Sequence, residues 1–269
     1  MRDFTLNLYK ELLSEFLGAG YSFFTFEDWC LGKAEGKYII LRHDVDEMAK
    51  NALYMALLEN QLGIRATYNF RIVRQSDDPV IIKKIADWGH EIGYHYEDLA
   101  TAEGDYEKAI VSFRRNLAHF RTFYPVKTVS MHGSSTSVYD NRDLWKKYDF
   151  RLEGLIGEPY LSINFNEIYY ISDTGYCWDG FRSAIRDVVQ MSFENRYHHT
   201  RDIVLALRAD RFPEKAMVSA HTLWTNNVFL WACIFIREQI RNKVKRMSGN
   251  HRMIRNIYKK LVDLYWKIK

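Results

Sequence analysis

The sequence predicts an α/β fold, either a (β/α) barrel or a doubly wound sheet, with a helical segment appended at the C-terminus. Apolar runs alternate with helical patterns between residues 37 and 132, which is typical of parallel strands joined by crossover helices. The chain has 269 residues, 47% of them hydrophobic, which is close to the size of one barrel. Basic residues crowd the segment from Arg237 to Lys269, which indicates an appended element. We therefore expect a barrel domain over residues 1–226 and amphipathic helices over 227–269.

The first half of the chain shows the alternation most clearly. Apolar residues at helical spacing between Leu6 and Phe16 predict an opening helix, which nearby glycines end. "KYIILRH" from Lys37 is continuously apolar at its centre and predicts a strand. "MAKNALYMALLENQLG" then has good helix formers with Gly63 just past the helix end, and "RATYNFRI" from Arg65 predicts the next strand.

The alternation continues to residue 221. The pattern predicts a helix at 79–88, a strand at 91–95, a helix at 105–123, a strand at 127–132 and a strand at 216–221. The region from Tyr148 to Cys177 differs, because "NEIYYISDTG" is typical of short strands that could pair antiparallel around an excursion.

Composition excludes several classes of protein. The three cysteines, Cys30, Cys177 and Cys233, are far apart and odd in number, so neither a disulfide framework nor a CxxC metal site is expected. The N-terminus lacks the apolar region of a signal peptide. The longest apolar run, Val228 to Ile236, is about half of the roughly 20 residues that a membrane-spanning helix needs. We expect a cytoplasmic protein, with peripheral membrane contact left open by the basic C-terminus.

Polar side chains directly follow four of the predicted strands. They are His43, Asp44 and Asp46 on the first, and then His95, His132 and His221 on three others. Since the carboxyl ends of such strands converge on the active site, these groups should meet. Asp and His are ligands for a hydrolytic zinc or similar divalent ion, and a further carboxylate and histidine can act as base and acid.

Each of these residues also has a structural interpretation when taken alone. Asp44 and Asp46 could cap the following helix, and His43 and His95 could be hydrogen-bonded core residues. The structural interpretation weakens when the residues are taken together, because it must explain the same placement on four strands.

Three motifs resemble those of the metal-dependent polysaccharide deacetylases, the chitooligosaccharide and peptidoglycan N-deacetylase type of carbohydrate esterase. "LRHDVD" is similar to the family's first motif, "GHEIGYHYEDL" from Gly89 to its second, and "VSAH" from Val218 to a late motif with a histidine. The resemblance covers about residues 37–224. It implies an irregular (β/α) barrel of the polysaccharide-deacetylase type with one divalent metal ion, usually zinc, at the carboxyl ends of the strands.

The resemblance also implies roles for individual residues. Asp44 would be the general base, Asp46 and His95 metal ligands, and His221 the general acid beside the leaving amine. His90 lies on the turn before its strand and is interpreted as structural. The reaction implied is hydrolysis of an N- or O-acetyl group on a glycan.

The sequence departs from the family pattern at the second metal histidine. Leu99 stands where that histidine usually follows, and leucine cannot ligate. Glu97, Asp98 or His132 must then supply the missing ligand, and we favour His132 because "SMHGS" ends a strand of its own. A turn-capping role for His132 remains an alternative. The family's Arg-x-Pro-Tyr motif is also absent, with only a partial echo in "GEPY".

Several further residues are candidates for substrate binding or for support of the site. Asp173 could orient a histidine, as carboxylates behind metal sites often do, and Trp178 could stack on a sugar ring or be a core aromatic. Trp224 has the same two interpretations. His43 should point away from Asp44 if the strand pleat persists, which favours a supporting or core role.

The basic C-terminus has three interpretations. Its helices could pack on the barrel with a solvated basic face, or contact anionic lipid headgroups. Nucleic acid is disfavoured, because no binding motif is present and the net charge is only +4.

The function predicted from the sequence is removal of an acetyl group from an amino sugar or glycan precursor, in the synthesis of a surface polysaccharide. Three alternatives stay open: hydrolysis of a non-sugar amide on the same barrel, a catalytically degenerate barrel that binds glycan, and a membrane-docking scaffold.

Overall fold

The computed structural model describes residues 2–133, 137–179, 189–194 and 196–248. The strands are β1 (Ser22–Phe24), β2 (Tyr38–Val45), β3 (Thr67–Phe70), β4 (Glu91–Tyr96), β5 (Val129–Met131), β6 (Tyr169–Ser172) and β7 (Lys215–His221). The α-helices are α1 (Leu6–Gly18), α2 (Phe26–Cys30), α3 (Ala49–Gln61), α4 (Pro79–Asp87), α5 (Asp98–Thr101), α6 (Tyr106–Arg121), α7 (Leu144–Lys147), α8 (Pro159–Ser162), α9 (Thr200–Arg208) and α10 (Val228–Ser248).

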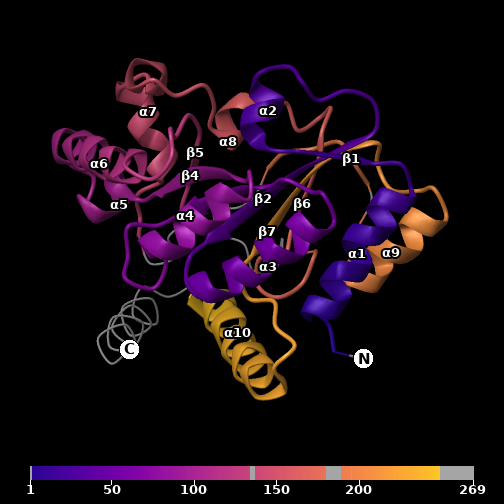
Figure 1. Cartoon of the computed structure of the whole chain (residues 1–269). Coiled ribbons are helices and arrows are strands. Elements are labelled where there is room, and N and C mark those ends of the chain that lie inside the picture. The colour runs from indigo at the N-terminus through magenta and orange to yellow at the C-terminus, as the bar shows by residue number, and fades with distance from the viewer. Residues whose placement is uncertain (1, 134–136, 180–188, 195, 249–269) are drawn as a thin grey trace.

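The strands form one parallel sheet. Their order is β5-β4-β3-β2-β7-β6, with β1 also paired to β2. Figure 1 shows the sheet in the middle of the molecule, with α3 and α4 on the near face and α1 beside α9 at one side. Among the described residues β5 and β6 do not pair with each other, so the sheet is a half-barrel. The predicted α/β class and the appended helix are confirmed.

β2 lies at the centre of this arrangement. It pairs with β1, β3 and β7, and all eight of its residues are buried. Burial on both faces explains why the run from Tyr38 to Leu41 is continuously apolar. It also means that Arg42, His43 and Asp44 must find partners inside the protein.

The structure differs from the sequence prediction in two ways. β6 runs parallel to β7, with Tyr169 opposite Ala216, whereas an antiparallel pairing was anticipated for this region. The chain between them includes α9, which provides a crossover connection. The short elements β1, α2, α5, α7 and α8 were not predicted, because short segments carry little periodicity. The helix α9 was also not predicted, although its buried apolar residues recur at helical spacing.

The C-terminal segment begins with a long helix. α10 runs from Val228 to Ser248 and therefore includes the whole apolar run that ends at Ile236. No helix among the described residues has both the length and the apolar character needed to cross a membrane. The second helix predicted for the basic segment falls in 249–269, outside the described residues.

Candidate active site

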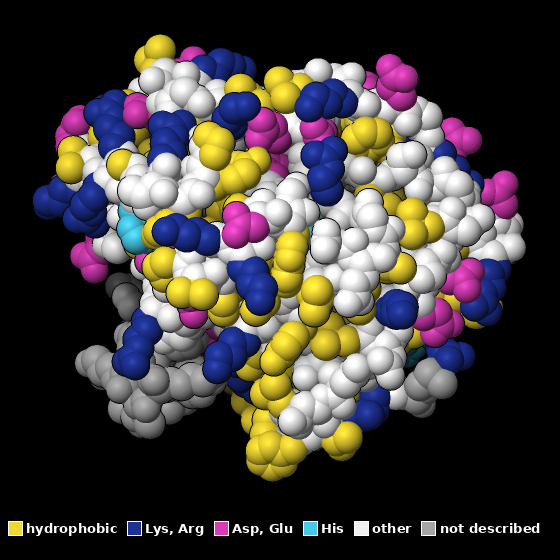
Figure 2. Space-filling view, in the orientation of Figure 1, with side chains coloured by type: hydrophobic (Ala, Val, Ile, Leu, Met, Phe, Trp, Pro, Cys, Tyr) yellow, Lys and Arg dark blue, Asp and Glu magenta, His cyan; other side chains and the backbone are white. Residues whose placement is uncertain are grey.

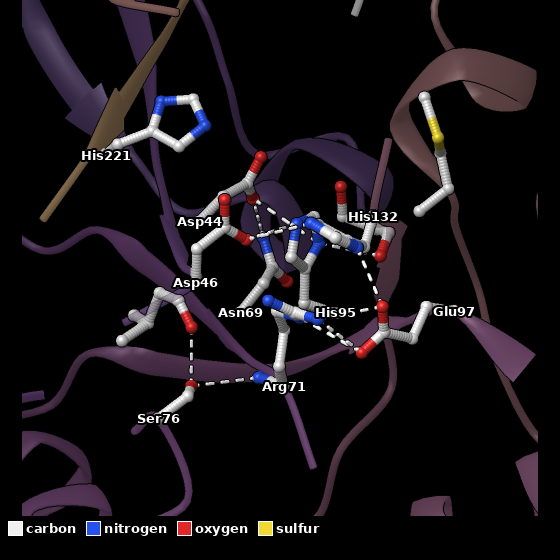
Figure 3. Close-up of polar contacts among 12 residues, drawn as sticks. Asp44, Asp46, Asn69, Arg71, Ser76, His95, Glu97, His132 and His221 are labelled. Carbon is white, nitrogen blue, oxygen red and sulfur yellow. Dashed lines mark hydrogen bonds and ion pairs between the residues drawn. The ribbon is translucent and has the colours of Figure 1, made fainter. Parts of the chain in front are cut away.

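The register of the sheet places polar residues from neighbouring strands in one row. His221 of β7 lies opposite Asp44 of β2, Asp44 opposite Asn69 of β3, and Asn69 opposite Gly93 of β4. Paired residues of a parallel sheet point to the same face, so the side chains of His221, Asp44 and Asn69 meet at one edge. Figure 3 shows this row beside the histidines that follow β4 and β5.

Asp44 is buried and held from two sides. One carboxylate oxygen accepts a hydrogen bond from Arg42 Nη2 at 2.9 Å, and the other accepts one from Asn69 Nδ2 at 3.1 Å. Arg42 is itself fully buried and also donates to Tyr160 Oη at 2.9 Å and Ser219 Oγ at 3.1 Å. The carboxylate orientation is therefore determined by the sheet rather than by solvent.

Three further side chains lie close together next to Asp44: those of Asp46, His95 and His132 (Figure 3). Asp46 Oδ1 lies 3.4 Å from His95 Nε2 and 3.6 Å from His132 Nε2. The two imidazole centroids are 5.3 Å apart, with the rings at 72° to each other. The three side chains come from the ends of β2, β4 and β5, so three separate strands bring them together.

Both histidines are oriented by their far nitrogens. His95 Nδ1 lies 2.9 Å from the carbonyl oxygen of Ser130, and His132 Nδ1 lies 2.9 Å from Glu97 Oε2. Because a carbonyl or carboxylate oxygen can only accept, each Nδ1 carries the proton in the neutral ring. Each Nε2 then presents a lone pair toward Asp46, which is how histidines are held at metal sites.

Glu97 is bound tightly on its other side as well. Arg71 Nη2 donates to both carboxylate oxygens, at 2.6 Å and 2.8 Å. Burial would raise the pKa of Glu97, but His132 and Arg71 lower it to about 2, so the group is ionised at neutral pH. Burial and the charge of Arg71 lower the pKa of His132, whereas Asp46 and Glu97 raise it, and the balance is a lowered pKa; the neutral ring is the form that can ligate.

Asp46 carries an unsatisfied oxygen. Its Oδ1 is buried and makes no hydrogen bond with the described residues. Burial would raise the pKa of Asp46, but His132, His95 and Arg71 hold it well below its usual range. A buried, ionised oxygen without a hydrogen-bond donor is a feature that a cation would satisfy.

Two of the distances among these atoms are close to those expected between ligands of a tetrahedral metal ion. Nitrogen and oxygen ligands lie about 2.0–2.1 Å from zinc, so that two ligand atoms are roughly 3.3 Å apart. The two distances from Asp46 Oδ1, 3.4 Å and 3.6 Å, are close to this value. Among the residues that the structure describes, no group of three or more His, Cys, Asp or Glu side chains has the full geometry of a metal site. The fit therefore rests on these two distances and on the unsatisfied Asp46 oxygen.

His221 is held on the other side of Asp44. Its Nδ1 lies 2.7 Å from Asp173 Oδ1, and Trp224 Nε1 donates to Asp173 Oδ2 at 2.9 Å. Burial would lower the pKa of His221, but the hydrogen bond and charge of Asp173, with the charges of Asp46 and Asp44, raise it to about 10. The ring is therefore protonated at neutral pH.

His43 points to the opposite face of the sheet, as the pleat predicts. Its Nε2 lies 2.8 Å from Glu59 Oε1, and its Nδ1 lies 3.0 Å from the carbonyl oxygen of Ala220. The helix-capping interpretation of the aspartates does not apply, because α3 begins after Met48 and has no side-chain cap.

Two of the predicted substrate-binding or supporting residues lie elsewhere. Asp98 is buried against α6, where it accepts hydrogen bonds from Tyr94, Ser112 and Asn116, because it follows β4 on the face away from His95. Trp178 is buried beside Phe4 and donates to Thr200 Oγ1 at 2.8 Å. Its ring is covered by core residues, so a stacking role on a sugar does not fit. Trp224 is also buried, and its contact with the site is the bond to Asp173.

The sequence patterns do not single out Arg42, Asn69 or Arg71, although all three hold residues of the site. A signal is nonetheless present. Arg42 precedes Asp44 by two residues and therefore lies on the same face of β2. Asn69 at the end of β3 and Arg71 just after it are also two residues apart and therefore share a face. The same polar pattern thus occurs on two neighbouring strands.

Comparisons with known proteins give matches among solved structures. No protein-family model matches the chain, and no curated protein matches it. One similar structure is a CE4 family pseudoenzyme from Bacillus anthracis, with a TM-score of 0.40 and 14% identity over 76% of this chain and 61% of that chain. A mutant of that pseudoenzyme with restored enzymatic activity has a TM-score of 0.42 and 14% identity over 77% of this chain and 62% of that one.

A family 4 carbohydrate esterase from Streptomyces lividans, in complex with acetate, is also similar, with a TM-score of 0.39 and 16% identity over 76% of this chain and 86% of that chain. The chain thus spans about three fifths of the length of the pseudoenzyme structures. All of these TM-scores lie below 0.5. The structural neighbours of this chain are CE4 family carbohydrate esterases, a pseudoenzyme among them.

Proposed function

We propose that this protein is a divalent-metal-dependent hydrolase that removes an acetyl group from an amino sugar or glycan precursor, in the synthesis of a surface polysaccharide. The observation that carries the proposal is the position of Asp46 Oδ1, 3.4 Å and 3.6 Å from two histidine nitrogens whose lone pairs face it. The acetylated sugar as substrate comes from the motifs "LRHDVD", "GHEIGYH" and "VSAH".

Asp46, His95 and His132 would hold the metal ion, and their mixed nitrogen and oxygen donors suit zinc. When bound, the ion would supply a Lewis acid that polarises the acetyl carbonyl and makes a nearby water more acidic. Asp44 would accept the proton of that water as general base. Arg42 and Asn69 would hold its carboxylate toward the reacting atoms.

His221 would protonate the leaving amine. It lies directly opposite Asp44 in the sheet register, so acid and base would flank the same acetyl group. Asp173 keeps the ring oriented and raises its pKa, which supports a proton donor rather than an acceptor at neutral pH.

The test is metal content and acetate release for a matched set of variants. Asp46→Ala and His95→Ala should lose the metal found in the wild-type protein after purification without chelator, as measured by elemental analysis. Asp44→Asn should keep the metal and lose about 10²–10⁴-fold in acetate release. His119→Ala is the control, because His119 pairs with Asp77 away from the site. Undiminished metal in both Asp46→Ala and His95→Ala would contradict the proposal.

A glycan-binding barrel without catalysis is the second candidate, and Leu99 is the feature that favours it. Leu99 is buried in the core, so no ligand can come from this position. A purified protein that retains an acetylated sugar but holds no metal and releases no acetate would establish this candidate. A panel that adds cyclic amides to the acetylated sugars would identify a non-sugar substrate.

A further inference from the structure

The outer face of α10 carries an exposed apolar row. Phe229 is 79% exposed, Ile236 57% and Ile240 59%, and Cys233 between them is also exposed. These residues are separated by three or four positions and so lie on one side of the helix. Figure 2 shows hydrophobic side chains gathered at the lower edge of the molecule, where Figure 1 places α10.

The inner face of α10 is attached to the loops of the candidate site. Arg237 forms an ion pair with Glu47, the residue after Asp46, at 2.5 Å. Asn242 donates to the carbonyl oxygen of Gly175, two residues after Asp173, at 2.7 Å. The helix thus contacts both the loop that supplies the proposed metal ligand and the loop that holds His221.

The positive charge of the chain is concentrated in its C-terminal segment, which begins within α10. The 33 residues from Arg237 to Lys269 contain eleven Lys or Arg and two Asp or Glu. Because the whole chain carries only +4, residues 1–236 are net negative. An apolar helix face that is followed in the sequence by a strongly basic segment is complementary to an anionic lipid surface, where apolar side chains enter the headgroup boundary and cations bind the lipids.

We propose that α10 docks the protein on an anionic lipid bilayer and that the substrate is a lipid-linked acetylated sugar held at that surface. The substrate part rests on the function proposed above. The docking part does not, because it follows from the outer face of α10 and the charge distribution.

A bilayer suits this face better than a second copy of the chain. A dimer through α10 would bring two segments of high positive charge together, and the repulsion would oppose the apolar contact. An anionic bilayer turns the same charges into an attraction.

The test uses the full chain and sedimentation with vesicles. Wild-type protein should bind vesicles of equal parts phosphatidylglycerol and phosphatidylcholine, bind phosphatidylcholine alone weakly, and lose binding as salt rises. The triple variant Phe229→Ser, Ile236→Ser, Ile240→Ser should bind the anionic vesicles about tenfold or more weakly. The matched control is Val80→Ser with Leu152→Ser, which removes side chains that are 75% and 84% exposed on other elements, and it should bind as the wild type does.

Three results would overturn the docking: no binding of the wild type to anionic vesicles, equal binding by the triple variant, or a wild-type dimer in light scattering that the triple variant abolishes while vesicle binding is unchanged. Circular dichroism melting of each variant checks that the fold is retained.

The substrate arm compares an N-acetylglucosaminyl lipid in anionic vesicles with a soluble N-acetylglucosamine oligomer. Wild-type protein should deacetylate the vesicle-bound lipid with the higher kcat/KM, and the triple variant should lose this preference while keeping its rate on the soluble oligomer. Equal kcat/KM values for the two substrates in the wild type would overturn the lipid-linked assignment and leave the hydrolase intact. If neither substrate released acetate, the proposed deacetylase activity would be refuted, and vesicle binding would still test the docking separately.

Discussion

At the scale of single residues, Arg42 holds the orientation of the Asp44 carboxylate, the candidate general base. A guanidinium with no solvent contact must be satisfied within the protein, and Arg42 bonds to Asp44, Tyr160 and Ser219. The same contacts hold the Asp44 carboxylate in one orientation. Tyr160 of "GEPY", the segment that partly matches the Arg-x-Pro-Tyr motif, accepts a hydrogen bond from Arg42.

Glu97 should determine how well His132 can bind a metal. Glu97→Gln keeps the shape of the side chain but removes the charge that holds both His132 and Arg71. Metal affinity, measured by competition with a chelator, should fall roughly 10–100-fold. Asp77→Asn removes the carboxylate of a comparable pair with His119 away from the site and should leave affinity unchanged. An unaltered affinity in Glu97→Gln would show that His132 does not depend on this contact.

The Asp173 and His221 pair should make stability depend on pH. A folded-state pKa of about 10, against an ordinary value of 6.5, means that the pair contributes fully below the ordinary value and is lost as pH rises through about 10. Asp173→Asn should therefore melt below the wild type at about pH 6, with a smaller difference at about pH 10. Asp179→Asn, which breaks the partly exposed pair with His198, should show little change at either pH. A Tm difference that is the same at both values would exclude the assigned shift.

At the scale of elements, β4 shows why the motif "GHEIGYH" contains its second glycine. A Cβ on Gly93 would overlap Asn69 Oδ1 and come within 3.3 Å of the carbonyl oxygen of Thr128. Asn69 in turn donates to Asp44. The glycine therefore makes room on β4 for the residue on β3 that holds the base on β2.

Gly93→Ala should accordingly reduce both stability and activity. We expect a loss of about 1–3 kcal/mol in the free energy of unfolding, since the added methyl group must displace Asn69. Acetate release should fall even where the protein is folded, because Asp44 loses one of its two donors. Gly18→Ala is the control, since a Cβ there meets nothing within 4 Å. Wild-type activity in Gly93→Ala would show that Asn69 is dispensable.

At the scale of the whole molecule, we propose separate tasks for the half-barrel and for α10. The sheet edge gathers the catalytic candidates, and α10 contacts two loops of that edge while turning an apolar row outward. A change at the outer face of α10 should therefore affect docking without affecting the sheet.

Ending the chain after Ser248 should separate charge from apolar contact. The shortened protein keeps α10 and its contacts to Glu47 and Gly175 but loses six of the eleven basic residues of the C-terminal segment. It should retain its melting temperature and metal content, and bind anionic vesicles about tenfold or more weakly with less dependence on salt. An unchanged salt dependence would show that the removed residues do not contact the lipid.

Much of the architecture could be predicted because it depends on local spacing. Alternating apolar runs and helical patterns determine where most strands and helices lie, and polar residues just past the strand ends indicate the edge where a site would form. The pleat of β2 alone separates His43 from Asp44. These inferences use only residues close together in the chain.

Only the tertiary structure decided which polar residues meet. The register between β2, β3, β4 and β7 aligns His221, Asp44, Asn69 and Gly93, and no local pattern specifies pairing between strands distant in sequence. The burial of Trp178, the turning of Asp98 toward α6 and the attachment of α10 to Glu47 likewise depend on packing between remote segments. The sequence by itself determined the kinds of groups at the strand ends, and the packing of the sheet determined their neighbours, because side-chain contacts follow from distances in space rather than along the chain.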